Sequence, residues 1–214
     1  MIFKENKEKI FGLKSIPSFE HEHLNDMDYL SFSGSVPVSG PHFSDCVSEK
    51  FSQIFCEIKK VKNILEIGVD RPNNPNENSS TKIIFNNKRD ETVYLGVDLN
   101  DKSNLDDPEK NIHTLKSDSM NKELVYSKLK ELKIKKFDFI FIDGWHSINA
   151  VMYEWENYVA PLLSKSGVCL FHDVNTHPGP YYLFECLDRD IFEVSKYCNA
   201  MGLGVVRYRK DLKK

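Results

Sequence analysis

Asn63-Ile-Leu-Glu-Ile-Gly68, followed along the chain by Leu95-Gly-Val-Asp98, is the stretch that decides the fold. The first run is short and apolar and ends in glycine. A polar loop and a helix predicted around Ser79 to Asn87 separate it from the second run, whose strand is predicted to begin at Thr92. Apolar strands that alternate with amphipathic helices are typical of a mainly parallel sheet covered on both faces. The segment is therefore predicted to be the first half of a doubly wound, Rossmann-like α/β domain.

The rest of the chain continues the alternation. A helix is predicted from Phe43 to about Lys60, ahead of the first strand. Apolar periodicity then predicts a seven-stranded, mainly parallel sheet that ends in an antiparallel strand, with helices on both faces. The further strands are Ile112–Lys116, Phe137–Ile142, Gly167–Phe171, Ile191–Ser195 and Leu203–Tyr208, and the further helices are Ser119–Leu132, Ser147–Leu163 and Tyr181–Leu187.

Residues 1–42 have no such pattern and are predicted to be an N-terminal arm or lid, with the domain itself spanning 43–214. Glycine and proline punctuate the end of this arm, at Gly34, Pro37, Gly40 and Pro41. A later run, Thr176-His-Pro-Gly-Pro180, is predicted to be a rigid loop and is a second candidate for a lid over the site.

Composition restricts the function. With 214 residues and a net charge of −3, the chain has no global basic field that would recruit nucleic acid or an anionic membrane. No stretch approaches the roughly 20 apolar residues of a membrane span. The five cysteines are odd in number and include no CxxC pair, which argues against a disulfide framework and a structural zinc site. We therefore expect a cytoplasmic protein.

Polar residues follow the predicted strands where a doubly wound sheet binds its ligands. Gly68 would let backbone approach a ligand, with Glu66 beside it. Asp98 ends the second strand, where a carboxylate suits ribose hydroxyls. Asp118 and Ser119 follow the third strand and could hold an adenine amino group. No GxGxxG turn is present, which argues against a nicotinamide dinucleotide.

The densest cluster is Asp143-Gly-Trp-His146 after the fourth strand, with Phe171-His-Asp-Val174 after the fifth. Neighbouring strands lie about 4.8 Å apart, so Asp143 and Asp173 could share one small site for an oxygen-preferring cation such as Mg²⁺. His172 or Asn175 could be the third ligand. His172 could equally hold the ligands in position by hydrogen bonding without binding the metal itself. His146 could take a proton from an attacking hydroxyl. His177 is predicted to be a structural residue.

These motifs resemble those of class I S-adenosylmethionine-dependent methyltransferases. Leu65-Glu-Ile-Gly68, Leu95-Gly-Val-Asp98 and Phe139-Ile-Phe-Ile-Asp-Gly144 carry the likeness. The pattern from Phe141 to Asp173, with Gly202-Leu-Gly-Val-Val-Arg207, is similar to the small-molecule branch that includes macrocin O-methyltransferase and the cephalosporin hydroxylase-type proteins.

The resemblance implies S-adenosylmethionine as cofactor. It implies that Glu66 and Gly68 lie beside its methionine portion, that Asp98 binds its ribose, and that Asp118 and Ser119 flank its adenine. It further implies metal ligands at Asp143, His172 and Asp173 and a base at His146. Two positions depart from the family pattern: the loop Asp70 to Ser80 lacks the usual glycines, and His172 stands where macrocin-type enzymes have Glu. Imidazole is a poorer ligand for Mg²⁺ than for Mn²⁺ or Fe²⁺, so that second change bears on whether Mg²⁺ is the metal.

The expected function is O-methylation of a small polar acceptor, such as a sugar or a glycosylated metabolite, assisted by Mg²⁺ or Mn²⁺. Neither nucleic acid nor a membrane is an expected partner, and assembly into a homo-oligomer is left open. The alternatives are a nucleic-acid or protein methyltransferase on the same fold, a non-catalytic module that binds the nucleoside cofactor, and an oxidation reaction, for which no flavin or facial iron signature is present.

Overall fold

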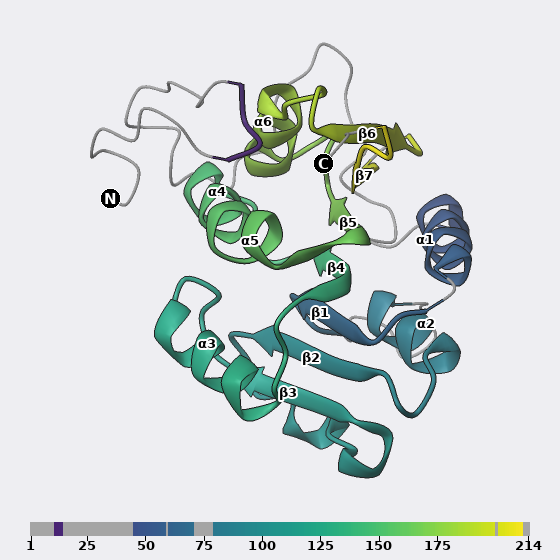
Figure 1. The fold of residues 1–214 in the computed structure, drawn as a ribbon, viewed down its shortest axis with the longest axis vertical. Coiled ribbons are helices and arrows are strands. Elements are labelled where there is room, and N and C mark those ends of the chain that lie inside the picture. The colour runs from purple at the N-terminus through teal and green to yellow at the C-terminus, as the bar shows by residue number, and fades with distance from the viewer. Residues whose placement is uncertain (1–10, 15–44, 59, 71–78, 200, 212–214) are drawn as a thin grey trace.

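A computed structural model of the chain describes residues 11–14, 45–58, 60–70, 79–199 and 201–211 (Figure 1). Most of the predicted arm, residues 1–42, lies outside the described residues, so the proposed division into arm and domain stays a prediction. Residues 11–14 pack on the domain: the Lys14 amide donates to the Cys186 carbonyl at 2.8 Å, and the Trp155 indole donates to the Phe11 carbonyl at 3.0 Å.

A seven-stranded sheet forms the centre of the described fold, in the order β3-β2-β1-β4-β5-β7-β6. Strands β1 to β5 run parallel, and β7 is antiparallel to both of its neighbours, β5 and β6. The predicted doubly wound fold is confirmed. The strands are β1 (Asn63–Ile67), β2 (Val93–Asp98), β3 (Ile112–Lys116), β4 (Phe137–Ile142), β5 (Leu163–His172), β6 (Phe192–Tyr197) and β7 (Leu203–Tyr208).

The sheet changes winding direction between β1 and β4. The chain first builds outward from β1 to β3, then crosses back so that β4 pairs with the other side of β1. Ile67 and Ile142 are register partners, so both strands end at the same level. In open α/β sheets the ligand crevice lies beyond such a switch point. Gly68 and Asp143 therefore stand at the position where a ligand is expected.

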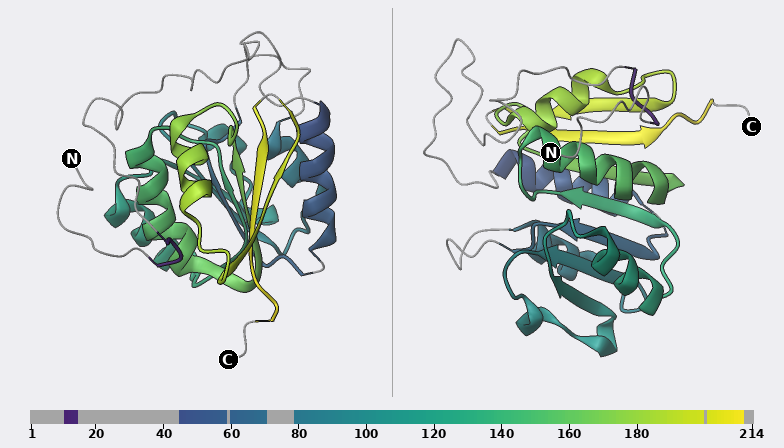
Figure 2. Two further views of the ribbon diagram at one scale, coloured as in Figure 1. Left: turned by 90° about the horizontal axis from the view of Figure 1, so that it is seen from above. Right: turned by 90° about the vertical axis from the view of Figure 1, so that its left-hand side faces the viewer.

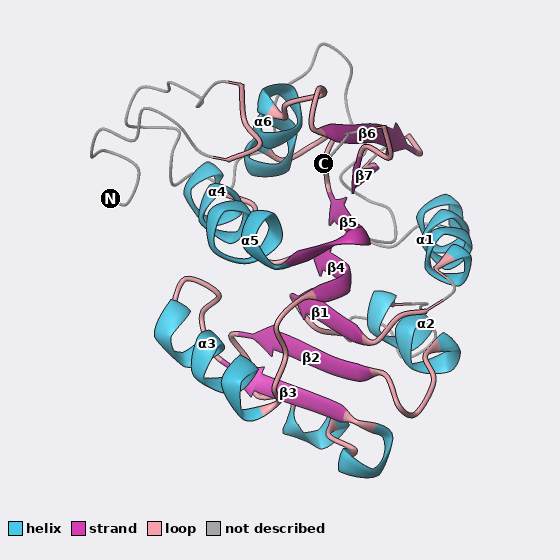
Figure 3. Ribbon diagram, in the orientation of Figure 1, coloured by secondary structure: helices cyan, strands magenta, loops and turns pink. Residues whose placement is uncertain are grey.

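Helices cover both faces of the sheet (Figures 2 and 3). Successive side chains of each strand point to opposite faces of the sheet, so each strand contributes to the core on both faces. On β4, Ile140 packs into the core beneath α3, α4 and α6, whereas Phe139 and Phe141 pack against α1. The helices are α1 (Asp45–Glu57) and α2 (Ser80–Asn87) on one face, with α3 (Lys122–Glu131), α4 (Ile148–Glu154), α5 (Ala160–Leu162) and α6 (Pro178–Cys186) on the other. Short 3₁₀ turns occupy Ser103–Leu105 and Pro108–Lys110.

Two predicted elements differ in the structure. The single helix predicted from Ser147 to Leu163 is interrupted by a π-helical turn, Trp155–Val159, and its last residue already begins β5. The run Thr176–Pro180 was predicted to be a loop, but its last residues form the start of α6. Proline is compatible with a first helical turn because no amide donor is needed there. The predicted loop is therefore wrong beyond His177.

The cysteines also correct a prediction. Cys46 in the first turn of α1 and Cys198 after β6 form a disulfide across a separation of 152 residues. The odd cysteine count and the wide spacing hid this pair, because spacing rules recognise only local frameworks. The bond ties α1 to the β6–β7 hairpin. Within the described parts of the chain, no helix combines the length and apolar character needed to cross a membrane.

Candidate functional site

Four predicted site residues meet at the carboxyl ends of β4 and β5. The His146 Nε2 atom lies 3.3 Å from Asp143 Oδ1 and 3.1 Å from Asp173 Oδ2. The His172 Nδ1 atom lies 3.2 Å from the same two oxygens. His146, His172 and Asp173 are buried, while Asp143 keeps 17% of its side chain exposed. The structure thus brings together the predicted base and all three predicted metal ligands.

Backbone geometry holds this cluster in place. Asp173 adopts a left-handed conformation, with φ of +60°, that non-glycine residues enter at a cost of about 1 to 3 kcal/mol. Its carbonyl accepts hydrogen bonds from the amides of Thr176 and His177, the two residues that precede α6. Gly179 in α6 packs closely on the segment after β4, because a Cβ at this position would lie 2.5 Å from the His146 carbonyl oxygen. The β4 and β5 halves are therefore locked together through α6.

Charge pairing dominates the electrostatics of the cluster. Burial alone would lower the pKa of His172, but Asp143 and Asp173 outweigh it and raise this pKa to about 10. Burial alone would raise the pKa of Asp143, but His172 and His146 hold it below its usual range. The pKa of Asp173 is likewise held low, chiefly by His172 against the effect of burial. Without a bound ion, the cluster therefore contains an imidazolium between two carboxylates.

His177 stacks on His146. Their ring centroids are 4.6 Å apart with 21° between the planes. Burial, as the largest cause, lowers the pKa of His177 to about 4, so its ring stays neutral at physiological pH. The other candidate ligand, Asn175, donates from its amide to the Cys198 carbonyl at 3.2 Å. Of the two candidates for the third metal ligand, His172 is therefore the one that lies beside both aspartates.

The predicted cofactor residues line the adjoining edge of the sheet. Gly68 has φ of +84°, and a Cβ there would lie 2.1 Å from the Asp143 carbonyl oxygen. The glycine is thus required by the neighbouring strand as well as by any ligand. Asp98 accepts the Val69 amide at 2.8 Å and the Asn100 amide at 2.7 Å, one on each carboxylate oxygen. Each oxygen has a second lone pair, so the carboxylate is fixed in orientation yet still able to accept ribose hydroxyls.

Asp118 and Ser119 differ in environment. Asp118 is exposed and caps the following turn by accepting the Met120 amide at 2.8 Å. Ser119 is buried and donates its hydroxyl to Glu154 Oε1 at 2.6 Å. The other oxygen of this carboxyl, Oε2, has no hydrogen-bond partner among the described residues. Burial raises the pKa of Glu154 to about 8, although the Ser119 hydrogen bond opposes the shift. Ser119 thus rests on a protonated, buried acid.

Glu66 is also fully buried. Its carboxyl group accepts hydroxyl hydrogen bonds from Ser80 at 2.5 Å, Thr81 at 2.9 Å and Tyr94 at 2.5 Å. Burial raises its pKa to about 7 against the effect of those three hydroxyls. The contacts join β1, β2 and the start of α2. Glu66 therefore stabilises the packing of these three elements in the interior. Its predicted contact with the methionine portion of the cofactor stays a prediction.

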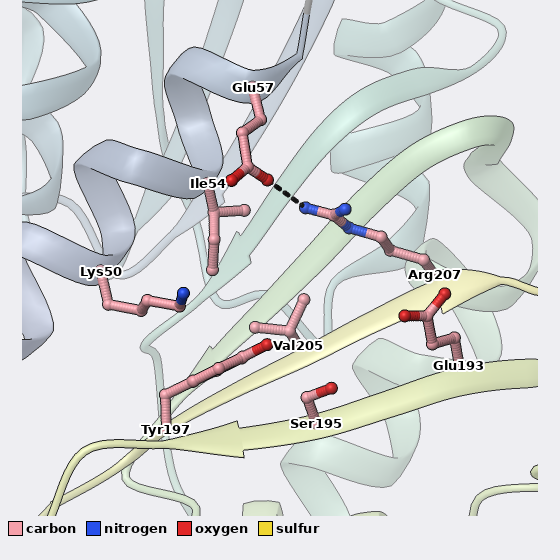
Figure 4. A pocket seen from close by; sticks show the side chains of 8 residues that line it. All are labelled: Lys50, Ile54, Glu57, Glu193, Ser195, Tyr197, Val205 and Arg207. Atoms are coloured by element: carbon pink, nitrogen blue, oxygen red, sulfur yellow. Dashed lines mark hydrogen bonds and ion pairs between the residues drawn. The ribbon is translucent and has the colours of Figure 1, made fainter.

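A surface groove between α1 and the β6–β7 hairpin is separate from these residues (Figure 4). Lys50 lies over the Tyr197 ring at 4.3 Å, and Arg207 pairs with Glu57 at 3.4 Å. No predicted site residue lines this groove. The candidate site is the cluster at the strand ends.

Glu154 is the residue that sequence reasoning missed. It occurs within the apolar stripe of the helix predicted from Ser147 to Leu163, three residues after the inward-facing Val151. An acidic residue on the buried side of an amphipathic helix is the signal that could have found it.

Comparison with known proteins gives one partial match to a family model and several matches to solved structures. Residues 77–174 match a family model described as a methyltransferase domain. No curated protein matches the chain. MycE methyltransferase from the mycinamycin biosynthetic pathway, solved with Mg, S-adenosylhomocysteine and mycinamycin VI, has a TM-score of 0.55 at 17% identity. That alignment covers 78% of this chain and 50% of MycE, so the chain spans about half the length of that relative.

Two further solved structures have comparable similarity. A putative caffeoyl-CoA O-methyltransferase from Staphylococcus aureus has a TM-score of 0.56 at 17% identity, covering 81% of this chain and 86% of its own. CalS11, a TDP-rhamnose 3'-O-methyltransferase of calicheamicin biosynthesis, has a TM-score of 0.54 at 12% identity, covering 75% and 78%. At these identities the likeness concerns the fold. The sheet order and these likenesses show that the chain has a Rossmann-like methyltransferase fold.

Proposed function

We propose that this protein transfers a methyl group from S-adenosylmethionine to a hydroxyl of a small polar acceptor, such as a sugar or a glycosylated metabolite. The observation that carries the proposal is the convergence of Asp143, His146, His172 and Asp173 beside Gly68, at the switch point of a methyltransferase fold. The acceptor class is supported by MycE, whose structure holds mycinamycin VI, and by CalS11, which is described as a TDP-rhamnose 3'-O-methyltransferase.

The cofactor would bind along the edge formed by Gly68, Asp98, Asp118 and Ser119. The chemistry of these groups fits: carboxylate oxygens accept hydroxyl and amino protons, and the serine and aspartate after β3 stand beyond the next strand end. When bound there, S-adenosylmethionine supplies an electrophilic methyl group on a positively charged sulfur. This chain would supply the orientation, with Asp98 held rigid by two backbone amides.

Proton removal is assigned to His146. In the transfer, the acceptor oxygen forms a bond to the methyl carbon, the carbon–sulfur bond breaks with its electron pair going to sulfur, and the hydroxyl proton moves to Nε2 of His146. The carboxylates of Asp143 and Asp173, at 3.3 and 3.1 Å, would stabilise the positive charge that develops on the ring. His177, stacked behind the ring, would hold its plane.

A divalent cation would be held by Asp143, Asp173 and His172, whose donor atoms lie within 4.8 Å of one another. Two carboxylates fit Mg²⁺ or Mn²⁺, and such an ion would supply Lewis-acid polarisation of acceptor oxygens.

The test combines binding and turnover. Calorimetry with S-adenosylhomocysteine should show binding by the wild-type chain and by His146→Ala. Release of S-adenosylhomocysteine from S-adenosylmethionine should then be followed over a panel of sugar nucleotides and glycosylated metabolites. His146→Ala should lose about 10²- to 10⁴-fold in kcat, the size of general-base assistance. Full activity in that variant would remove the base assignment, and full activity after chelation would remove the cation.

A further inference from the structure

The turn after β3 is held from the interior by two residues of the helix that begins with α4. The Ser119 hydroxyl donates to Glu154 Oε1 at 2.6 Å, and the Tyr158 hydroxyl donates to the Ser119 carbonyl oxygen. Glu154 is the last residue of α4, and Tyr158 follows four residues later in the π-helical turn, so both lie on the same side of the helix. All three residues are buried. Ser119 is therefore fixed at its backbone and at its side chain by separate hydrogen bonds.

The hydrogen bond to Glu154 determines what the Ser119 oxygen can still do. A serine hydroxyl has one proton and two lone pairs. Because the proton is directed to Glu154 Oε1, only lone pairs remain for another partner. Burial keeps Glu154 neutral, with a pKa of about 8, and a neutral carboxyl group retains one oxygen that only accepts. The Ser119 oxygen is thus an acceptor, and not a donor, toward a ligand at this edge of the sheet.

Glu154 is unfavourable for stability in this position. It is 0% exposed, and its second oxygen, Oε2, has no hydrogen-bond partner in the part of the chain that the structure describes. A buried polar oxygen without a partner lowers the stability of the fold. The carboxyl group also lies against the segment after β4, because a Cβ at Gly144 would lie 3.3 Å from Oε1. A group that breaks a packing rule in this way is expected at a functional site rather than in an ordinary core.

The turn that carries Ser119 adjoins the carboxylate assigned to ribose. The Ser117 amide donates to the Asp98 carbonyl oxygen at 2.8 Å, so the ends of β2 and β3 are neighbours. We propose that Glu154 is a positioning residue that keeps Ser119 an acceptor, so that the site selects a purine with a 6-amino group over one with a 6-oxo group. The inference rests on the proposed function, because it takes Asp98 and Ser119 as parts of the nucleoside site.

The chemistry of the two purines makes this selection strong. A 6-amino group donates hydrogen bonds and can meet the lone pairs of Ser119, whereas a 6-oxo group only accepts. A site built around a fixed hydrogen-bonding group rejects a mismatched ligand because buried polar groups are then left unpaired. Without the Glu154 carboxyl group, the Ser119 hydroxyl could turn its proton outward and donate to a 6-oxo group. Removal of Glu154 should therefore relax the selection.

Calorimetry on the full-length chain measures this selection with two ligands. The selectivity ratio is the Kd of S-inosylhomocysteine, which has a 6-oxo group, divided by the Kd of S-adenosylhomocysteine. The wild type should have a ratio of at least about 10, the equivalent of one good hydrogen bond. Whatever other contacts to the base contribute, Glu154→Leu should lower this ratio by about 10-fold. Glu154→Met, with a more flexible apolar side chain, is a second variant with the same expected result.

Three further variants separate orientation of the hydroxyl from simple packing. Glu154→Gln can still accept the Ser119 hydroxyl through its amide oxygen and should keep the wild-type ratio. Tyr158→Phe removes only the bond to the Ser119 backbone, so it should weaken binding of both ligands by a similar factor and leave the ratio unchanged. Ser119→Ala should lower the ratio as Glu154→Leu does, and the two changes combined should lower it no further, because they remove the same interaction.

The outcomes separate this inference from the proposed function. Thermal unfolding shows which variants are folded before their binding is compared. A ratio that Glu154→Leu and Glu154→Met leave unchanged, or that falls equally in Tyr158→Phe, overturns the role of Glu154, while S-adenosylhomocysteine binding by the same samples keeps the proposed function in place. A wild type that binds both ligands equally well also overturns the inference. A wild type that binds neither ligand overturns the proposed function and the inference together.

Discussion

The buried acid Glu154 makes stability depend on pH in a way that can be isolated. Its pKa is about 8 in the folded protein, against an ordinary value of 4.5, because burial disfavours the charged form. A carboxyl whose pKa is raised by folding contributes stability that is fully present below pH 4.5. That contribution is lost as the pH rises toward and through 8, since the unfolded chain ionises first.

The size follows from the shift. The difference between 4.5 and about 8 is about 3.5 units. With each unit equal to 1.36 kcal/mol, the Glu154 contribution should fall by about 4 kcal/mol between pH 5 and pH 8.5. Glu154→Gln cannot ionise, so its free energy of unfolding should lack this fall. The variant can still accept the Ser119 hydroxyl bond through its amide oxygen.

Urea unfolding at fixed ionic strength from pH 5 to pH 8.5 checks this expectation. The free energy of the variant minus that of the wild type should rise by about 4 kcal/mol across the range. Glu66, whose pKa is also raised, is present in both proteins and cancels from the difference. Glu123→Gln on the exposed surface of α3 is the control. Parallel curves for Glu154→Gln and the wild type would refute a protonated, buried Glu154.

Three further perturbations test other parts of the structure. Gly68→Ala should destabilise the protein by more than about 2 kcal/mol in urea unfolding, because the new Cβ meets the Asp143 carbonyl oxygen at 2.1 Å on a backbone with φ of +84°; a neutral effect would contradict the tight β1–β4 approach. Reducing the Cys46–Cys198 disulfide should cost about 3 to 5 kcal/mol by the same assay, given the 152-residue separation, with Cys46→Ser insensitive to reductant. Asp98→Asn should weaken S-adenosylhomocysteine binding by roughly 10- to 100-fold in calorimetry, the loss of one charged hydrogen bond, and unchanged affinity would remove Asp98 from the ribose site.

Local patterns were sufficient to predict the strands and most of the helices. β3 and β4 have the predicted bounds, because a short apolar run between polar turns leaves little freedom in where a buried strand begins and ends. The sheet order places β4 beside β5, so the ends of these two strands are neighbours. The prediction that Asp143 and Asp173 could share one site depended on this pairing. That topology places the predicted metal and base residues at one edge of the sheet.

Contacts between segments that are distant in sequence could not be predicted from local patterns. The Ser119–Glu154 hydrogen bond spans 35 residues and the Cys46–Cys198 bond 152, and neither leaves a mark in the local pattern. The π-helical turn at Trp155 accompanies the packing of its ring on Phe171 and Phe192, which are themselves separated along the chain. Such features depend on the tertiary fold and appear only when it is assembled.

The same distinction explains why His172 matters more in the structure than in the sequence. In the sequence it is a departure from the residue that macrocin-type relatives have, and it bears only on the choice of metal. In the structure its Nδ1 atom stands 3.2 Å from both aspartates, opposite His146, so that imidazole and carboxylate alternate around one centre. A Glu at this position would add a third negative charge, which a hard cation would have to balance. With His172, the two carboxylates raise the pKa of the ring to about 10 and hold it protonated, so we expect that a cation can bind this nitrogen only after the proton has left.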